Sequence, residues 1–135
     1  MKTSISFMKS LLSPKGTILK IEKTDCDYIH VDLMDGKFTK NKNYTIGELK
    51  SLVGNSSKKL DIHLMVNNPI KYIDELATLN VSYISFHYEA VTNHLELIEY
   101  IKNMGIKVGM AIKPKTKIKK IMDIIPYLDL IIVMG

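Results

Sequence analysis

Short apolar runs rich in β-branched residues alternate along the chain with stretches whose apolar positions recur every three to four residues. The runs predict strands at residues 3–7, 28–33, 60–65, 81–87, 106–112 and 128–134. The stretches between them predict helices at residues 17–24, 45–53, 92–104 and 116–125, and one more that begins with Asn68 as N-cap and Pro69 as first residue. Thr45 and Glu48 match a capping box, and Gly105 is a typical helix stop. The pattern therefore predicts six strands separated by helices.

Strict alternation of strand and helix is typical of βαβ units, which build a parallel sheet. Right-handed crossovers leave two architectures, an open doubly wound sheet or a closed (β/α) barrel. The segment after the first strand contains only Gly16, so the glycine-rich phosphate fingerprint of dinucleotide-binding folds is missing. No linker or low-complexity stretch divides the chain, and we predict a single α/β domain over residues 1–135.

The composition narrows the class of protein further. The chain has 135 residues, of which 46% are hydrophobic and 24% charged, and its single cysteine cannot form an internal disulfide. No apolar run approaches the roughly 18–20 residues that cross a bilayer, and the N-terminus has no convincing secretory signal, so we expect a cytoplasmic protein without a membrane partner. The net charge of +5 comes from 19 lysines and no arginine. Because arginine supplies the bidentate contacts that nucleic-acid-binding proteins favour, we expect no nucleic acid partner, although lysines 113–120 could attract a phosphorylated small molecule.

Polar side chains inside predicted buried strands are the candidates for chemistry, because burying an uncompensated charge is costly. His30 and Asp32 share one face of the second strand, and Asp61 and His63 share one face of the third. In a parallel sheet these strands are neighbours, so His30, Asp32 and His63 could converge and bind zinc, iron or manganese. The alternative for each histidine alone is a bond to a backbone carbonyl, but two such pairs on adjacent strands favour the metal site. His87, at the end of the fourth strand, is either a partner behind the ligands or part of a buried salt link.

Five segments resemble the ribulose-phosphate 3-epimerase family in sequence, order and spacing. They are HVDLMDGKF (30–38), DIHLMVNNP (61–69), SFHYEA (85–90), KVGMAIKPKT (107–116) and LDLIIVM (128–134). The resemblance implies a TIM barrel. It also implies a metal-dependent isomerase of the pentose phosphate pathway that inverts C3 of a ketose phosphate, converting D-ribulose 5-phosphate to D-xylulose 5-phosphate.

The resemblance also assigns roles to individual residues. His30, Asp32 and His63 match the ligands of one divalent cation (Zn, Fe, Mn or Co), and Asp32 matches a catalytic acid/base. The matched substrate contacts are Ser4, His63, Met34, Met65 and Met134. The implied mechanism is proton transfer by aspartate at the carbon next to the carbonyl, through an enediolate.

Two departures from the family modify these expectations. The loop after Gly36 reads KFTKNKN, where the family has a Val-Pro-Asn loop. The chain also ends directly after the sixth predicted strand, whereas a TIM barrel has eight strands and typically about 250 residues. We therefore expect a barrel truncated after the sixth strand, without the family's second catalytic aspartate and phosphate loops, and little activity from this chain alone. Two alternative functions stay open: an allulose-6-phosphate 3-epimerase, and an inactive fragment that binds only metal or a partner chain. The oligomeric state, including a homo-oligomer, also stays open.

Overall fold

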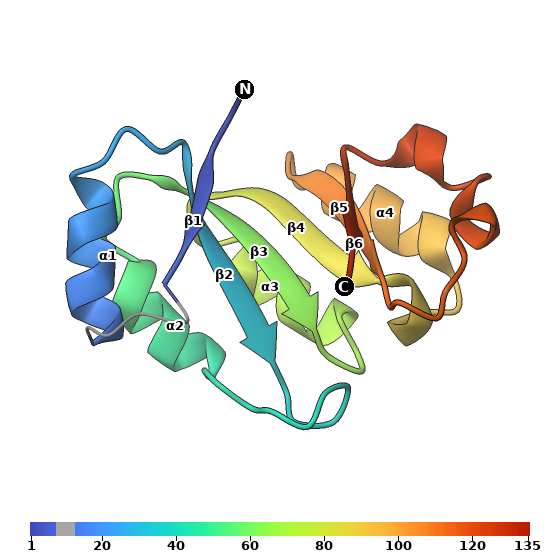
Figure 1. Cartoon of the computed structure of the whole chain (residues 1–135), viewed down its shortest axis with the longest axis horizontal. Coiled ribbons are helices and arrows are strands. Elements are labelled where there is room, and N and C mark those ends of the chain that lie inside the picture. The colour runs from blue at the N-terminus through green and yellow to red at the C-terminus, as the bar shows by residue number, and fades with distance from the viewer. Residues whose placement is uncertain (8–12) are drawn as a thin grey trace.

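Six parallel strands form one sheet in the order in which they occur along the chain, β1-β2-β3-β4-β5-β6. The computed structural model describes residues 1–7 and 13–135. The strands are β1 (Ser4–Ser6), β2 (Tyr28–Met34), β3 (Lys59–Met65), β4 (Val81–His87), β5 (Lys107–Ile112) and β6 (Leu130–Val133). The α-helices are α1 (Pro14–Glu22), α2 (Ile46–Val53), α3 (Ile70–Leu76) and α4 (His94–Lys102), and short 3₁₀ turns are η1 (Tyr88–Ala90), η2 (Ile118–Ile121) and η3 (Ile125–Tyr127) (Figure 1).

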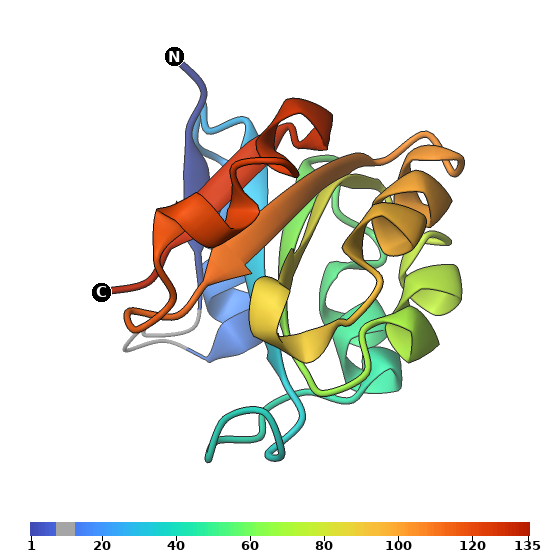
Figure 2. The same ribbon diagram turned by 90° about the vertical axis from the view of Figure 1, so that its right-hand side faces the viewer.

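The strand order distinguishes between the two architectures that the alternating pattern allows. A doubly wound sheet reverses its strand order at a switch point, and this sheet has no reversal. The sheet instead curls, with α2, α3 and α4 along its outer side (Figure 2). The molecule is a curled half-barrel of the TIM-barrel type, as the family resemblance implies.

The helix-facing side of the sheet forms the core. Side chains alternate between the two faces of each strand. On the outer face of β2 to β5, ten apolar side chains are no more than 1% exposed: Ile29, Val31, Leu33, Leu60, Ile62, Leu64, Ile84, Phe86, Val108 and Met110. Leu49 of α2, Ile73 of α3 and Ile101 of α4 belong to the same cluster and are fully buried. Burying each such side chain contributes about 1.5–3 kcal/mol. The opposite, inner face is left for polar residues.

The predicted strands are confirmed, and the predicted helix boundaries are confirmed in part. Thr45 caps α2, its Oγ accepting a hydrogen bond from the Glu48 amide at 3.1 Å. Gly105 ends the segment after α4 with φ +76°. Helix α1 begins three residues before the predicted position, because the Ser13 side chain caps it and accepts from the Gly16 amide at 3.1 Å. The Asn68 cap is wrong: Pro69 already has helical dihedral angles, and no side chain caps α3.

The predicted helix at residues 116–125 is also wrong. The structure has two short 3₁₀ turns there, η2 and η3. Within η2 only Ile121 is buried, so the segment has no continuous apolar face to hold a helix against the sheet. Lysines three or four residues apart repel one another there, and Pro126 interrupts any continuation. None of the helices in the described part of the chain is both long enough and apolar enough to span a bilayer.

Candidate active site

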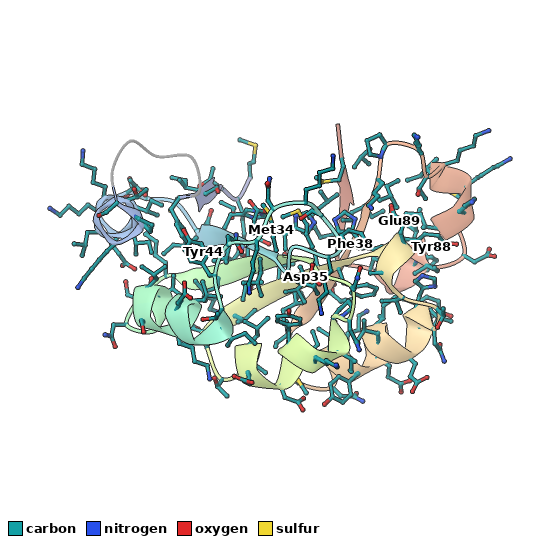
Figure 3. The ribbon with its side chains drawn as sticks, turned by 90° about the horizontal axis from the view of Figure 1, so that it is seen from below. Met34, Asp35, Phe38, Tyr44, Tyr88 and Glu89 are labelled. Carbon is teal, nitrogen blue, oxygen red and sulfur yellow. The ribbon has the colours of Figure 1, made fainter. Side chains whose placement is uncertain are left out.

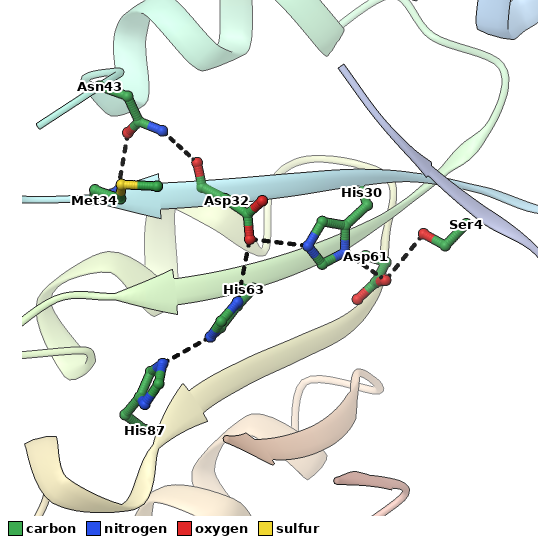
Figure 4. A network of polar contacts seen from close by, with 8 residues as sticks. All are labelled: Ser4, His30, Asp32, Met34, Asn43, Asp61, His63 and His87. Carbon is green, nitrogen blue, oxygen red and sulfur yellow. Dashed lines mark hydrogen bonds and ion pairs between the residues drawn. The ribbon is translucent and has the colours of Figure 1, made fainter. Parts of the chain in front are cut away.

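The inner face of β2 and β3 gathers two histidines and two aspartates. The strands pair in register, with Asp32 beside His63 and His30 beside Asp61. All four side chains point to the same side of the sheet, because each lies two residues from its partner on its own strand. Figure 4 shows them in one connected network with Ser4 and His87. The convergence predicted for His30, Asp32 and His63 is therefore what the structure shows.

One oxygen of Asp32 joins the two histidines. Asp32 Oδ1 lies 2.9 Å from His30 Nε2 and 3.2 Å from His63 Nδ1. One ligand atom from each of the three residues lies within 4.8 Å of the others, in the single group of this kind among the described residues. Zinc bonds of about 2.0–2.2 Å in a tetrahedral arrangement separate ligand atoms by roughly 3.4 Å. Two imidazoles and a carboxylate at these separations fit a divalent cation.

The pKa values of His30 and Asp32 are also consistent with binding of a cation. Burial lowers the pKa of His30, but the hydrogen bonds and charges of Asp32 and Asp61 outweigh it and raise that pKa from 6.5 to about 10. Burial raises the pKa of Asp32, but hydrogen bonds from His30 and His63 outweigh it and hold that pKa well below its usual value. Without metal, the site is thus a carboxylate paired with an imidazolium, and a cation would take the place of the proton on His30.

Further polar side chains contact the two histidines on the side away from Asp32. Asp61 Oδ2 is 2.9 Å from His30 Nδ1 and accepts a hydrogen bond from Ser4 Oγ at 3.0 Å. His87 Nε2 is 2.8 Å from His63 Nε2, and the two rings are stacked with centroids 4.9 Å apart. Burial, and then the neighbouring His63, lower the pKa of His87 to about 4. His87 is therefore neutral at ordinary pH.

The residues matched to substrate contacts lie around this network. Ser4 contacts Asp61, and Met34 and Met65 are buried side by side at the carboxyl ends of β2 and β3. Met134 follows β6, where its amide donates to the Ile112 carbonyl at 3.1 Å. The structure thus places Ser4 on β1, beside the two site strands, Met34 and Met65 at the ends of those strands, and Met134 directly after β6, at the other edge of the sheet.

The loop between β2 and α2 supplies residues that the sequence analysis missed. Asn43 Nδ2 donates to the Asp32 carbonyl at 2.6 Å, and Asn43 Oδ1 accepts from the Met34 amide at 2.9 Å. Asp35 Oδ1 accepts from the amides of Lys37 and Phe38 at 2.8 and 2.9 Å. The Asp-Gly pair at 35–36 was the available sequence signal for this turn, but nothing local marks Asn43 as the residue that holds the end of β2.

Phe38 in this loop covers the site from the side of β4. Its ring centroid lies 4.8 Å from that of His87, and Lys113 Nζ lies 4.0 Å from the Phe38 centroid. Glu89 accepts hydrogen bonds from the Lys113 amide and from Thr116 Oγ. In the view from below, Phe38 and Glu89 appear on one side of Asp35, and Met34 and Tyr44 on the other (Figure 3). The loop that departs from the family sequence therefore still reaches the site.

Comparisons with known proteins agree with this geometry. Residues 4–135 match the model of the Ribulose-phosphate 3 epimerase family. The chain is 40% identical over 117 residues to a ribulose-phosphate 3-epimerase of Schizosaccharomyces pombe, covering 83% of this chain and 50% of that protein. It is 31% identical over 116 residues to one of Chlamydia pneumoniae, covering 86% and 51%, and 30% identical over 139 residues to one of Treponema pallidum, covering 99% and 64%.

A solved structure has the same fold. The N-(5'-phosphoribosyl)anthranilate isomerase of Pyrococcus furiosus superposes with a TM-score of 0.62 at 15% identity, over 98% of this chain and 66% of that one. The chain spans about half to two thirds of the length of the curated relatives named above.

Proposed function

The chain belongs to the ribulose-phosphate 3-epimerase family, and we propose that it carries the metal-binding and proton-abstracting part of an active site that inverts C3 of a ketose phosphate. The substrate pair is D-ribulose 5-phosphate and D-xylulose 5-phosphate, in the pentose phosphate pathway of the cytoplasm. The observation that supports this most directly is the contact of one Asp32 oxygen with both His30 and His63 on the inner face of the sheet.

His30, Asp32 and His63 hold one divalent cation in this proposal, which is Zn, Fe, Mn or Co. The donor set of two imidazole nitrogens and a carboxylate oxygen suits all four of these metals. A bound cation supplies Lewis-acid stabilisation of the negative charge that develops on the sugar oxygens.

Asp32 is the catalytic base. The hydrogen on C3 is acidic because C3 is next to the carbonyl carbon, and the Asp32 carboxylate accepts that proton, which leaves an enediolate. Inversion requires a second group to return a proton to the opposite face, while a return from Asp32 itself restores the starting sugar. His30 and His63 hold the pKa of Asp32 low against the effect of burial, so the carboxylate is ionised in the metal-free chain.

Other inner-face residues orient the sugar. Met34 and Met65 present buried apolar surface at the carboxyl ends of β2 and β3, where they exclude water from the reacting carbon. Ser4, His63 and Met134 complete the proposed substrate contacts. The printed names of the curated relatives favour the pentose phosphate, and allulose 6-phosphate is the sister substrate to be compared with it.

The test of the proposed function is hydrogen exchange at C3. The chain, saturated with each candidate metal, is incubated with ribulose 5-phosphate or allulose 6-phosphate in D₂O, and deuterium at C3 is followed by NMR. We expect exchange with the pentose phosphate and its loss in Asp32→Asn, because an amide does not accept the proton. The control is Asp123→Asn, an exposed aspartate between η2 and η3. Equal exchange in Asp32→Asn and Asp123→Asn at saturating metal would remove Asp32 from catalysis.

A further inference from the structure

The two candidate ligand histidines approach Asp32 with different ring nitrogens. His30 turns Nε2 toward Asp32, and its Nδ1 lies 2.9 Å from Asp61 Oδ2. His63 turns Nδ1 toward Asp32, and its Nε2 lies 2.8 Å from His87 Nε2. Each histidine is therefore held on the side away from Asp32 by a second polar side chain, as the dashed lines in Figure 4 show.

We propose that Asp61 and His87 are positioning residues that fix which ring nitrogen each histidine presents to the metal, Nε2 for His30 and Nδ1 for His63. This inference rests on the proposed function, because it takes these two histidines and Asp32 as the ligands. Only a ring nitrogen without a hydrogen has a lone pair for a metal, so the residue that holds the other nitrogen in its N–H form decides the ligand atom.

Asp61 does this for His30. A carboxylate oxygen accepts hydrogen bonds, so the His30 nitrogen that faces Asp61 keeps its hydrogen, and the hydrogen that a metal displaces is the one on Nε2. Asp61 is only 8% exposed, and Ser4 Oγ donates to the same oxygen at 3.0 Å. The carboxylate is thus fixed from two sides by side chains of β1 and β2, and the orientation of the His30 ring follows from it.

His87 does the same for His63 with a nitrogen acceptor. A contact of 2.8 Å between two imidazole nitrogens needs one N–H and one lone pair. When His63 keeps a lone pair on Nδ1, its hydrogen is on Nε2 and points at the lone pair of His87 Nε2. The hydrogen of the neutral His87 ring is then on Nδ1, which faces Glu89 Oε2 at 3.8 Å, beyond hydrogen-bond distance.

The surroundings of His87 hold this arrangement without help from solvent. His87 is 2% exposed, its ring is stacked on His63, and the Phe38 ring lies 4.8 Å from it on the loop side. Its Nδ1 is buried and makes no hydrogen bond within the described part of the chain. An apolar side chain at this position would fill the same space and leave no buried polar atom unpaired. The contact of His87 Nε2 with His63 therefore gives the imidazole a role beyond packing.

The first test reads the tautomers directly. Long-range ¹H–¹⁵N NMR of the histidine rings distinguishes Nδ1–H from Nε2–H and identifies the metal-bound nitrogen in the zinc-loaded chain. We expect Nδ1–H with zinc on Nε2 for His30, and Nε2–H with zinc on Nδ1 for His63. Zinc on the same ring nitrogen of both histidines overturns the inference.

The second test compares zinc affinity, measured by competition with a chromophoric chelator, in pairs of variants. Asp61→Ala and His87→Leu remove the acceptor, and we expect each to weaken zinc binding about 10- to 100-fold. Asp61→Asn and His87→Gln keep an acceptor oxygen and should recover most of that loss. The control is Ser85→Ala, which should keep the original affinity. Ser85 is fully buried on the inner face of β4, two residues before His87.

The outcomes separate this inference from the proposed function. A chain that binds zinc at one equivalent, with His87→Leu and Asp61→Ala as tight as Ser85→Ala, overturns the positioning roles and leaves the metal site in place. Loss of affinity in the acceptor-keeping variants equal to that in Asp61→Ala and His87→Leu also overturns them, because packing alone would then explain the effect. An unaltered chain that binds no zinc, iron, manganese or cobalt overturns the proposed metal site, and this inference with it.

Discussion

Asp32 Oδ1 serves both His30 and His63, at 2.9 and 3.2 Å, so a single carboxylate oxygen concentrates negative charge where the two imidazoles meet. This contact favours proton binding by the histidine and disfavours proton binding by the carboxylate. The pKa of His30 rises to about 10 although burial works against it, while the pKa of Asp32 falls although burial works against that too. At neutral pH the metal-free site therefore holds a proton on His30 that a cation must displace.

Metal binding is expected to release protons. Between about pH 7 and pH 9 His30 is protonated in the metal-free chain, because that range lies below its pKa of about 10, and ligation through Nε2 requires that proton to leave. We expect release of about one proton per zinc ion from His30, and an apparent zinc affinity that rises with pH until His30 is neutral. Calorimetric titration in buffers of different ionisation enthalpy measures the number. Zinc binding without proton release at pH 7 would show that His30 is not a ligand.

Removing a ligand histidine should lower metal content. His63→Ala leaves two of the three ligand atoms, and we expect at least a tenfold weaker zinc affinity, since changes even behind the ligands typically cost 10- to 100-fold. The matched control is His94→Ala, because His94 lies on α4, where its Nε2 contacts the Tyr88 carbonyl at 2.8 Å, and is outside the group of candidate ligands. Zinc measured by elemental analysis after dialysis compares the two variants. Equal zinc in both would mean that the site is wrongly placed.

At the scale of elements, the period of two along each strand separates the apolar outer face from the polar inner face. The inner face also has size requirements, because β5 passes close between its neighbours. A Cβ at Gly109 would lie 2.2 Å from Ser85 Oγ of β4 and 3.2 Å from the Leu130 Cβ of β6. Glycine is therefore required at position 109 because side chains of β4 and β6 lie so close to β5. Its backbone φ is one that any residue can adopt.

Adding one methyl group to β5 should destabilise the sheet. We expect Gly109→Ala to lower the free energy of unfolding by about 1–3 kcal/mol, because overpacking displaces Ser85 or the strand itself. The control is Gly47→Ala on α2, where a Cβ meets only Thr45 Oγ at 3.9 Å. That change should raise the free energy of unfolding by up to about 1 kcal/mol, since alanine favours a helix over glycine.

Urea unfolding followed by circular dichroism measures both changes. The double variant Ser85→Gly/Gly109→Ala should recover part of the loss, because it removes the side chain with which the new methyl group clashes. Gly109→Ala as stable as the unaltered chain would show that β4, β5 and β6 are spaced more widely than in this structure.

At the scale of the whole molecule, the sheet is curled and has two edges, β1 and β6, in the part of the chain that the structure describes. Asp32, His30 and His63 all come from β2 and β3, so these two strands form one side of the proposed reaction site. Two other carboxylates lie near this site, and each has one oxygen in hydrogen bonds: Asp61 Oδ2 with His30 and Ser4, and Glu89 Oε1 with Lys113 and Thr116. Neither carboxylate is thus free of hydrogen-bond partners among these contacts.

We expect the 135-residue chain by itself to exchange the C3 hydrogen much faster than it inverts C3. Asp32 can remove and return a proton on one face, whereas inversion needs a proton donor on the other face, and precise positioning of the sugar contributes a large part of the rate. The measurement is conversion of ribulose 5-phosphate to xylulose 5-phosphate at saturating metal, beside the full-length Schizosaccharomyces pombe relative. Turnover within about tenfold of that relative would contradict this expectation and would assign the second proton transfer to another group, with Glu89 or a partner chain as the candidates.

The amino-acid sequence by itself determined the alternation of strands and helices and the pairing of His30 and Asp32 with Asp61 and His63. These are consequences of a period of two within a strand and of neighbouring parallel strands, both of which are local rules. Local capping signals placed the start of α2, but the lysine-rich stretch at 116–125 was wrongly predicted as a helix, because its apolar residues have no continuous face to bury.

Only the tertiary structure decided which nitrogen of each histidine faces Asp32, that Asp61 and His87 hold the other nitrogens, and that Phe38 and Asn43 reach the site. These contacts join positions that are up to 49 residues apart in the sequence, as with Phe38 and His87. Their distances depend on strand register, on the curl of the sheet and on the path of one loop. No local pattern specifies those quantities, because each is set by the packing of all the strands together.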